Sequence, residues 1–178
     1  SYVGSYVWGK GFVLTDTEAQ KLFSHDSINR DVIFPYLVGE DINRNPAQKA
    51  TKWVINFFDW PLEKASKYKE CLNILQEKVK PERELVKRAV YRDYWWQFAE
   101  KQKGLYDSIR YLSRVLVAAR VTKYINFVFV ENGQVYNEKT VISCFDEYMY
   151  FALLQSCFHD QWVQTFTSTL GSAGINYS

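Results

Sequence analysis

The sequence lacks the features that would place it in a membrane or in an oxidising compartment. No apolar stretch approaches the roughly 20 residues that a helix needs to span a bilayer, and no secretory segment lies near the start. Three cysteines, Cys71, Cys144 and Cys157, are an odd number without metal-ligand spacing, so neither a disulfide framework nor a metal site is indicated. A reduced compartment is the simpler inference, and we expect a cytoplasmic protein with no membrane partner.

Catalytic motifs are also missing. The element Gly9-Lys10-Gly11 is too short for a dinucleotide or phosphate fingerprint, and no Glu-x-Lys element, common in magnesium nucleases, occurs in the chain. Cys157 and His159 are two residues apart, so on a helix they point about 200° away from each other and cannot act as nucleophile and base. We interpret both as structural, and His25 as a solvated residue at a helix end.

What the sequence has in quantity is aromatic residues. Its 178 residues suffice for one domain with a sizeable core. Aromatic residues make up 17% of the chain. Their rings can pack in a core or stack on bases, so this fraction does not discriminate between functions. The net charge is only +2, which is small for a protein that binds nucleic acid, so the distribution of charge is more informative than its sum.

The pattern of helix and strand signals predicts an α+β fold, in which a mixed sheet with a β-hairpin packs against several helices in a single compact domain. Thr15 and Glu18 have capping-box spacing, which predicts a helix over 16–25. Pro61 suits the start of an amphipathic helix, and Pro81 interrupts it before a second helix that runs to about Glu100. Within that helix at least one of Trp95 and Trp96 should be buried.

Strands are predicted over 53–58, 115–121, 124–131 and 140–145. The dipeptide Asn132-Gly133 indicates a hairpin between the last two strands. Residues 31–38 are expected to form a short helix or turn, 42–51 a surface loop, and 146–167 the last helix. Asn56 and Asp59 are interpreted as local hydrogen-bonding residues.

One segment is rich in uncompensated positive charge. Between Asp107 and Glu131 there is no acidic residue. The candidate DNA-binding residues of this segment are Arg110, Arg114, Arg120, Lys123, Tyr124 and Asn126. Cations beside a β-hairpin would attract phosphate. The alternative is a solvated strand face with long basic side chains.

Two further segments are candidates for DNA contact. Lys80, Arg83 and Lys87 can share one helix face and contact phosphate, although acidic neighbours leave a merely solvated face as the alternative. After Asp160 the chain carries no charge, and its candidates are Ser172, Ala173, Gly174 and Asn176. Hydroxyl and amide groups can read base edges. The alternative for this segment is a frayed end.

Several segments, taken in order, resemble the target-recognition domain of single-chain type II restriction-modification enzymes, which join an N6-adenine methyltransferase to a nuclease. They are Trp53-Val54-Ile55-Asn56-Phe57-Phe58-Asp59-Trp60-Pro61, Val79-Lys80-Pro81-Glu82-Arg83, Trp95-Trp96, Leu154-Gln155-Ser156, His159, Trp162 and Tyr177-Ser178. The resemblance implies that the loop before Tyr177 faces the bases of double-stranded DNA. It also implies that residues 1–45 lead in from the methyltransferase domain of the same chain, and that 46–178 form the recognition domain.

The resemblance further implies a noncatalytic module. The Asn-Pro-Pro-aromatic motif of adenine methyltransferases is absent, so we expect no cofactor here and assign S-adenosylmethionine and magnesium to the parent enzyme. That parent would be an adenine-specific DNA methyltransferase with or without endonuclease activity. The alternative function is a protein-interaction module within a restriction or phage-defence assembly. Because the chain begins with Ser1 and stops at Ser178, we expect both ends to continue into further sequence.

Overall fold

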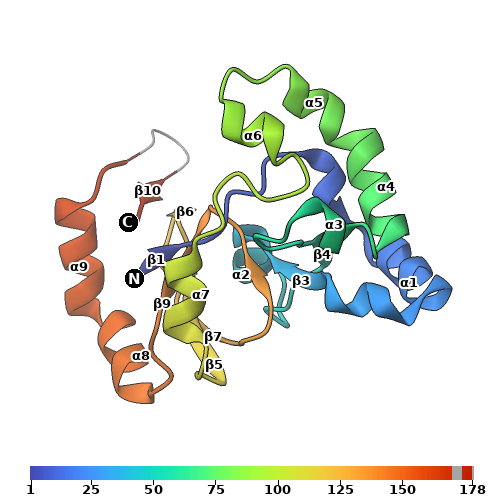
Figure 1. The fold of residues 1–178 in the computed structure, drawn as a ribbon. Coiled ribbons are helices and arrows are strands. Elements are labelled where there is room, and N and C mark those ends of the chain that lie inside the picture. Colours follow the sequence, from blue (N-terminus) through green and yellow to red (C-terminus); the bar gives the residue numbers. More distant parts are fainter. Residues whose placement is uncertain (170–173, 178) are drawn as a thin grey trace. The chain divides into compact units, whose positions relative to one another are not determined.

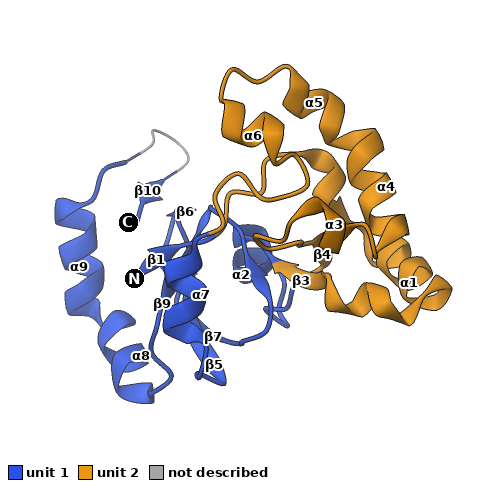
Figure 2. Ribbon diagram, viewed as in Figure 1, with its two compact units in different colours: residues 1–4, 37–50, 102–178 blue, residues 5–36, 51–101 orange. Residues whose placement is uncertain are grey.

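The computed structural model describes residues 1–169 and 174–177. Helices and strands occur together throughout, which confirms the α+β class (Figure 1). The chain divides into two compact units (Figure 2): unit 1 comprises Ser1–Gly4, Leu37–Ala50 and Gln102–Ser178, and unit 2 comprises Ser5–Tyr36 and Thr51–Lys101. The division expected at residue 45 falls inside a segment of unit 1, and the role of residues 1–45 as the segment that leads in from a methyltransferase domain stays a prediction. Among the described residues, no helix is both long and apolar enough to cross a membrane.

Unit 1 is built around a four-stranded antiparallel sheet with the order β1-β9-β5-β7. Its elements are β1 (Tyr2–Val3), α2 (Gly39–Arg44), α7 (Lys103–Ile109), β5 (Arg114–Ala119), β6 (Val121–Thr122), β7 (Val128–Glu131), β8 (Val135–Tyr136), β9 (Thr140–Ser143), α8 (Tyr148–Leu154), α9 (Cys157–Phe166) and β10 (Ile175–Asn176). Strand β5 is central, because it pairs with β7 on one side and β9 on the other.

Both faces of strand β5 are covered. Val115 and Val117 pack with residues of α7 and α2 in one apolar cluster. Leu116 and Ala118 point to the opposite face, where residues of α8 pack against them. Because successive side chains of a strand alternate between faces, a strand covered on both sides reads as a continuous apolar run. This accounts for the sequence Val-Leu-Val-Ala-Ala between Arg114 and Arg120.

Unit 2 contains a three-stranded antiparallel arrangement in which β4 lies between β2 and β3. Its elements are the 3-10 helix η1 (Lys10–Phe12), β2 (Val13–Leu14), α1 (Asp16–His25), the 3-10 helix η2 (Ser27–Asp31), β3 (Ile33–Leu37), β4 (Lys52–Ile55), α3 (Leu62–Ala65), α4 (Lys69–Lys78), α5 (Lys80–Glu84) and α6 (Ala89–Asp93). The predicted capping box is confirmed: the Glu18 amide donates to Thr15 Oγ1, and the Thr15 amide donates to Glu18 Oε2.

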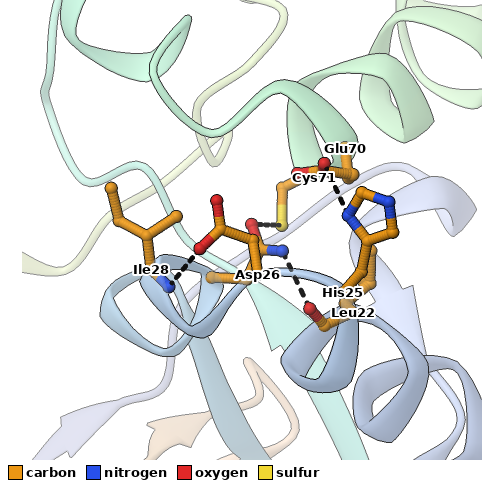
Figure 3. Close-up of polar contacts among 7 residues, drawn as sticks. Leu22, His25, Asp26, Ile28, Glu70 and Cys71 are labelled. Carbon is orange, nitrogen blue, oxygen red and sulfur yellow. Dashed lines mark hydrogen bonds and ion pairs between the residues drawn. The ribbon is translucent and has the colours of Figure 1, made fainter.

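Helices α1 and α4 of unit 2 are joined by polar contacts around a buried amide (Figure 3). Asn29 donates to the Leu22 carbonyl at 3.0 Å and lies 3.4 Å from Cys71 Sγ. Burial raises the pKa of the Cys71 thiol to about 12, so the thiol is protonated and donates to Asn29 Oδ1. Nearby, His25 Nδ1 lies 2.9 Å from Glu70 Oε1 at the exposed end of α1, which agrees with the interpretation of His25 as a helix-end residue.

Arg83 is the most deeply buried cation of unit 2, with 1% of its surface exposed. The guanidinium donates to backbone carbonyl oxygens. Nε donates to that of Trp8 at 3.1 Å, Nη1 to that of Tyr91 at 3.3 Å, and Nη2 to those of Val7 (3.0 Å) and Gln97 (3.2 Å). Burial lowers the pKa of the guanidinium to about 10, which leaves it charged near neutral pH. The predicted phosphate contact of Arg83 is therefore wrong, because the group is already enclosed and occupied by carbonyl oxygens.

Three expectations about unit 2 and its flanks are corrected. Residues 31–38 contain strand β3 rather than a helix, because β-branched and aromatic residues favour extended backbone and Pro35 disfavours a helix before it. The expected loop 42–51 begins within α2, where the Val38 amide donates to Asp41 Oδ2 at 3.1 Å and starts the helix. The helix expected to reach Glu100 breaks into α5 and α6.

The hairpin expected across Asn132-Gly133 is also corrected. Strand β7 pairs with β5, and β9 pairs with the other edge of β5, so the antiparallel neighbours in this region are β5 and β7. Both polar groups of the Asn132 side chain are hydrogen-bonded: Nδ2 donates to the carbonyls of Ile109 and Leu112, which lie 20 or more residues earlier in the sequence, and Oδ1 accepts from the Gly133 amide. The expected last helix divides into α8 and α9, because Ser156 caps α9 by accepting from the His159 amide.

Other expectations about single residues hold. Trp95 and Trp96 are both buried, with 8% and 6% of their surface exposed, which confirms their assignment to the core. Asn56 accepts from the Phe58 amide at 2.9 Å, as expected for a local hydrogen-bonding residue.

Replacing Arg83 with methionine should destabilise the protein by about 3–5 kcal/mol, the usual cost of removing one side of a buried charged network. Methionine fills similar space but leaves four carbonyl oxygens without this donor. Urea unfolding followed by tryptophan fluorescence measures the change. Lys87→Met is the matched control, because Lys87 is exposed and should change stability by less than about 0.5 kcal/mol. Equal stability of the two variants would contradict the structural role of Arg83.

Candidate nucleic-acid interface

Strands β6 and β10 bring together two segments of unit 1 that are far apart in the sequence. They pair antiparallel, with Asn176 opposite Val121, and the pair continues as the Tyr177 amide donates to the Arg120 carbonyl at 2.8 Å. The end of the basic segment therefore lies beside the end of the uncharged tail. Sequence patterns identified each segment separately but did not predict that they are neighbours.

Gly174 allows this close approach. Its φ of +100° is rarely adopted by L-residues. A Cβ atom at this position would lie 2.4 Å from the Thr122 carbonyl oxygen, far inside van der Waals contact. The predicted importance of this glycine thus has a backbone explanation: only glycine lets the tail reach β6 here.

The turn after β6 presents a cation, an aromatic ring and an amide. Thr122 Oγ1 donates to the Tyr124 carbonyl at 2.8 Å and closes the turn. Lys123 is exposed, with Nζ 5.4 Å from the centre of the Tyr124 ring, and Tyr124 itself is 69% exposed. Asn126 is half-buried, and its Oδ1 lies 3.4 Å from Gln155 Nε2. Lys123 and Tyr124 are therefore accessible to a large ligand.

Arg120 lies at the junction of β5 and β6. It is half-buried, its amide donates to the Lys139 carbonyl at 2.7 Å, and its buried Nε has no hydrogen-bond partner among the described residues. Lys139 is exposed and adds a third cation beside Arg120 and Lys123. Lys139 was not predicted from the sequence, because only the pairing of β9 with β5 places it here.

The other basic residues of the predicted segment lie elsewhere. Arg114 begins β5 and Arg120 follows its end, so about 20 Å of extended strand separates them. Nε and Nη2 of Arg114 donate to the Asp146 carbonyl at 3.0 and 2.8 Å, and its guanidinium stacks 4.0 Å from the centre of the Phe129 ring. Arg110 is exposed at the end of α7. The four cations of this segment therefore do not lie together, and DNA contact by Arg110 and Arg114 stays a prediction.

The remaining candidates divide between the two units. Lys80 in unit 2 is half-buried, with Nζ 5.6 Å from the centre of the Trp95 ring, whereas Lys87 is exposed. Ser172 and Ala173 lie outside the described residues. DNA contact by Lys80, Lys87, Ser172 and Ala173 stays a prediction.

His159 has a structural role. Nδ1 lies 2.8 Å from the Leu154 carbonyl oxygen and therefore donates to it, and in the neutral imidazole Nε2 then accepts from the Tyr177 hydroxyl at 3.1 Å. Burial raises the pKa of the Tyr177 phenol, which keeps this donor protonated. Cys157 is exposed at the start of α9. Among the described residues, no group of three or more His, Cys, Asp or Glu side chains could hold a metal ion.

Comparison with protein families matches residues 3–178 to the model of the MmeI target recognition domain. The chain belongs to the MmeI target recognition domain family. This confirms the resemblance seen in the sequence. A search of curated protein sequences found no match.

The MmeI family assignment agrees with a comparison of folds. A solved structure described as the type IIL restriction-modification enzyme MmeI in complex with DNA matches with a TM-score of 0.78 at 14% identity. The match covers 99% of this chain and 23% of the MmeI chain. The chain therefore has the fold of the corresponding part of MmeI and spans about a quarter of that protein's length.

Replacing Gly174 with alanine should weaken the β6–β10 pair, because the new Cβ would overlap the Thr122 carbonyl. Gly133→Ala is the matched control: Gly133 also has a positive φ, +91°, but a Cβ there would meet nothing within 4 Å. Both variants carry backbone strain of about 1–3 kcal/mol, and only Gly174→Ala adds the overlap. Amide hydrogen exchange at Tyr177 should accelerate in Gly174→Ala alone. Unchanged exchange there would contradict the pairing.

Proposed function

We propose that this chain is a noncatalytic domain that reads a specific sequence of double-stranded DNA and positions it for other domains of a restriction-modification enzyme. The observation that carries the proposal is the β6–β10 pair. It joins a cationic segment, which suits sequence-blind attraction of phosphate, to an uncharged tail of hydroxyl and amide groups, which suits reading of base edges.

The roles divide by chemistry. Arg120, Lys123 and Lys139 would contact phosphates, and Arg120 could also reach a guanine edge. Asn126 and Asn176 carry amides of the kind that recognise base edges. The carboxylate nearest in sequence, Glu138, accepts from the Asn137 side chain at 2.6 Å, so part of its charge is already hydrogen-bonded. A low net charge is compatible with DNA binding when the cations gather in one place.

The remainder of the enzyme would supply the chemistry. We assign S-adenosylmethionine and magnesium to domains outside this chain, in a cytoplasmic adenine-specific DNA methyltransferase with or without endonuclease activity. Residues 1–45 would dock on the methyltransferase domain. The family assignment supports a recognition role, and the fold shared with part of a larger DNA-bound enzyme supports the placement in a longer chain.

A second candidate function is protein interaction, which the outer face of α9 favours. Phe158, Trp162 and Phe166 recur every four residues, which places them on one helix face, and they are 83%, 57% and 71% exposed. Asp160 is the only carboxylate between Tyr148 and Phe166, and that stretch contains no Lys or Arg. A DNA phosphate backbone would find no positive charge on this face, whereas an apolar protein surface would bury its exposed aromatic rings.

Duplex DNA should bind the isolated chain with a dissociation constant on the order of 10⁻⁴ to 10⁻⁶ M and with a strong dependence on salt. Arg120→Ala and Lys123→Ala should each weaken binding and lower the slope of log K against log salt by about 1. Fluorescence anisotropy of a labelled duplex, titrated at several salt concentrations, measures both quantities.

Arg114→Ala provides the contrast, because the Arg114 guanidinium is bound to the Asp146 carbonyl. It should lose thermal stability while the salt slope stays unchanged. Lys67→Ala, an exposed cation of unit 2, should change neither. If the chain bound no duplex DNA at low salt, the result would contradict the DNA-reading function and favour the protein-interaction function.

A further inference from the structure

The junction between α8 and α9 supports the β6 turn of unit 1. Gln155 is the residue that follows α8, and its Oε1 accepts from the Phe127 amide at 2.9 Å. Its Nε2 lies 3.4 Å from Asn126 Oδ1. A single amide side chain therefore contacts Asn126 and Phe127, which lie two and three residues after Tyr124 and its exposed neighbour Lys123. The contact with Asn126 also favours one orientation of its amide, which is a candidate base reader.

The same junction supports the end of β10. Ser156 Oγ accepts from the His159 amide at 3.2 Å and holds the first turn of α9. Two ring contacts of His159 then connect the Leu154 carbonyl to the Tyr177 hydroxyl. The Phe127 ring fills the space between the two segments, 5.9 Å from the centre of the His159 ring and 5.5 Å from that of Tyr177. The turn after β6 and the residue after β10 thus share one support.

Shared support has different consequences for the two kinds of DNA contact. Long Lys and Arg side chains can follow a phosphate through small backbone shifts. An amide that reads a base edge needs its donor and acceptor held close to one geometry. Loss of the support should therefore affect sequence discrimination more than total affinity.

We propose that Gln155, His159 and Tyr177 are positioning residues that hold the Asn126 turn and β10 in one register, so that the two segments read neighbouring bases together. The inference rests on the proposed function of DNA reading. It assigns a role to the Leu154-Gln155-Ser156, His159 and Tyr177 landmarks of the sequence, none of which need touch DNA. Gln155 is exposed, so its main structural effect is on the turn rather than on a buried core.

The test compares Gln155→Met with Gln155→Glu. Methionine keeps the length of the side chain but removes the acceptor for the Phe127 amide, whereas glutamate keeps an oxygen at that position. Gln164→Met is the matched control, because Gln164 is an exposed glutamine of α9. Tyr177→Phe removes only the hydroxyl that donates to His159.

Two measurements on the full 178-residue chain separate the possible outcomes. In hydrogen exchange without DNA, the Phe127 amide should exchange severalfold faster in Gln155→Met, and at the wild-type rate in Gln155→Glu and Gln164→Met. In selection from a pool of short duplexes with a randomised centre, Gln155→Met and Tyr177→Phe should enrich the wild-type sequence roughly tenfold less, the scale of one lost base contact. Their affinity for the unselected pool should stay within about twofold, since phosphate contacts carry most of the sequence-blind affinity.

The outcomes separate a failure of the positioning role from a failure of the DNA-reading function. If the wild-type chain enriches no sequence, the DNA-reading function fails, while hydrogen exchange still decides whether Gln155 holds the turn. Wild-type enrichment in Gln155→Met would overturn the positioning role. The positioning role would also be overturned if Gln155→Met lowered the melting temperature and weakened binding to the unselected pool as much as it lowered enrichment. Such a result would show that the substitution only destabilises the fold.

Discussion

Burial of Val115 to Ala119 in β5 is the constraint on which unit 1 depends. Val115 to Ala119 are all enclosed, and the strand is hydrogen-bonded along both edges. A strand in that position can carry charge only at its ends, because burying an unpaired cation costs a desolvation free energy that apolar neighbours cannot offset. Arg114 and Arg120 consequently emerge at opposite ends of the sheet. One stacks on aromatic rings, and the other lies beside the β6–β10 pair.

The two units use arginine in opposite ways. In unit 2, Arg83 is enclosed and satisfies carbonyl oxygens from three stretches of chain, so its charge organises a fold. In unit 1, Arg120 keeps a buried Nε without a partner among the described residues, next to the exposed Lys123 and Lys139. An arginine that has spare donors beside other cations is suited to an anionic partner. Sequence alone could not separate these roles, because both residues lie in basic segments.

Features set by local chemistry were predictable. The capping box at Thr15 and Glu18 follows from their spacing within one helical turn. The burial of Trp95 and Trp96 follows from the large apolar surface of their side chains. Pairing between distant strands was not predictable, because the Asn132-Gly133 signal indicates a turn without specifying which strands flank it in space. The same limit hid Lys139 from the candidate site. Arg83 was misassigned because helix spacing places it on a face with Lys87, while its carbonyl partners come from residues 7, 8, 91 and 97.

The candidate site was predictable in its parts and not in its assembly. The absence of acidic residues between Asp107 and Glu131 made Arg120 to Asn126 candidates, and the absence of charge after Asp160 made the tail a candidate. Their adjacency depends on Gly174, whose missing Cβ lets the tail reach the Thr122 carbonyl. A glycine signals such freedom in the sequence but does not name its neighbour.

We propose that the β6–β10 pair and the turn after β6 form the surface that reads duplex DNA. Backbone amide chemical shifts of the isotope-labelled chain, followed while a short duplex is added at low salt, test it most directly. We expect the largest shifts on Arg120 to Asn126 and on Gly174 to Tyr177. Shifts confined to the Phe158 to Phe166 face of α9, or to the segment around Lys80 and Lys87, would contradict it.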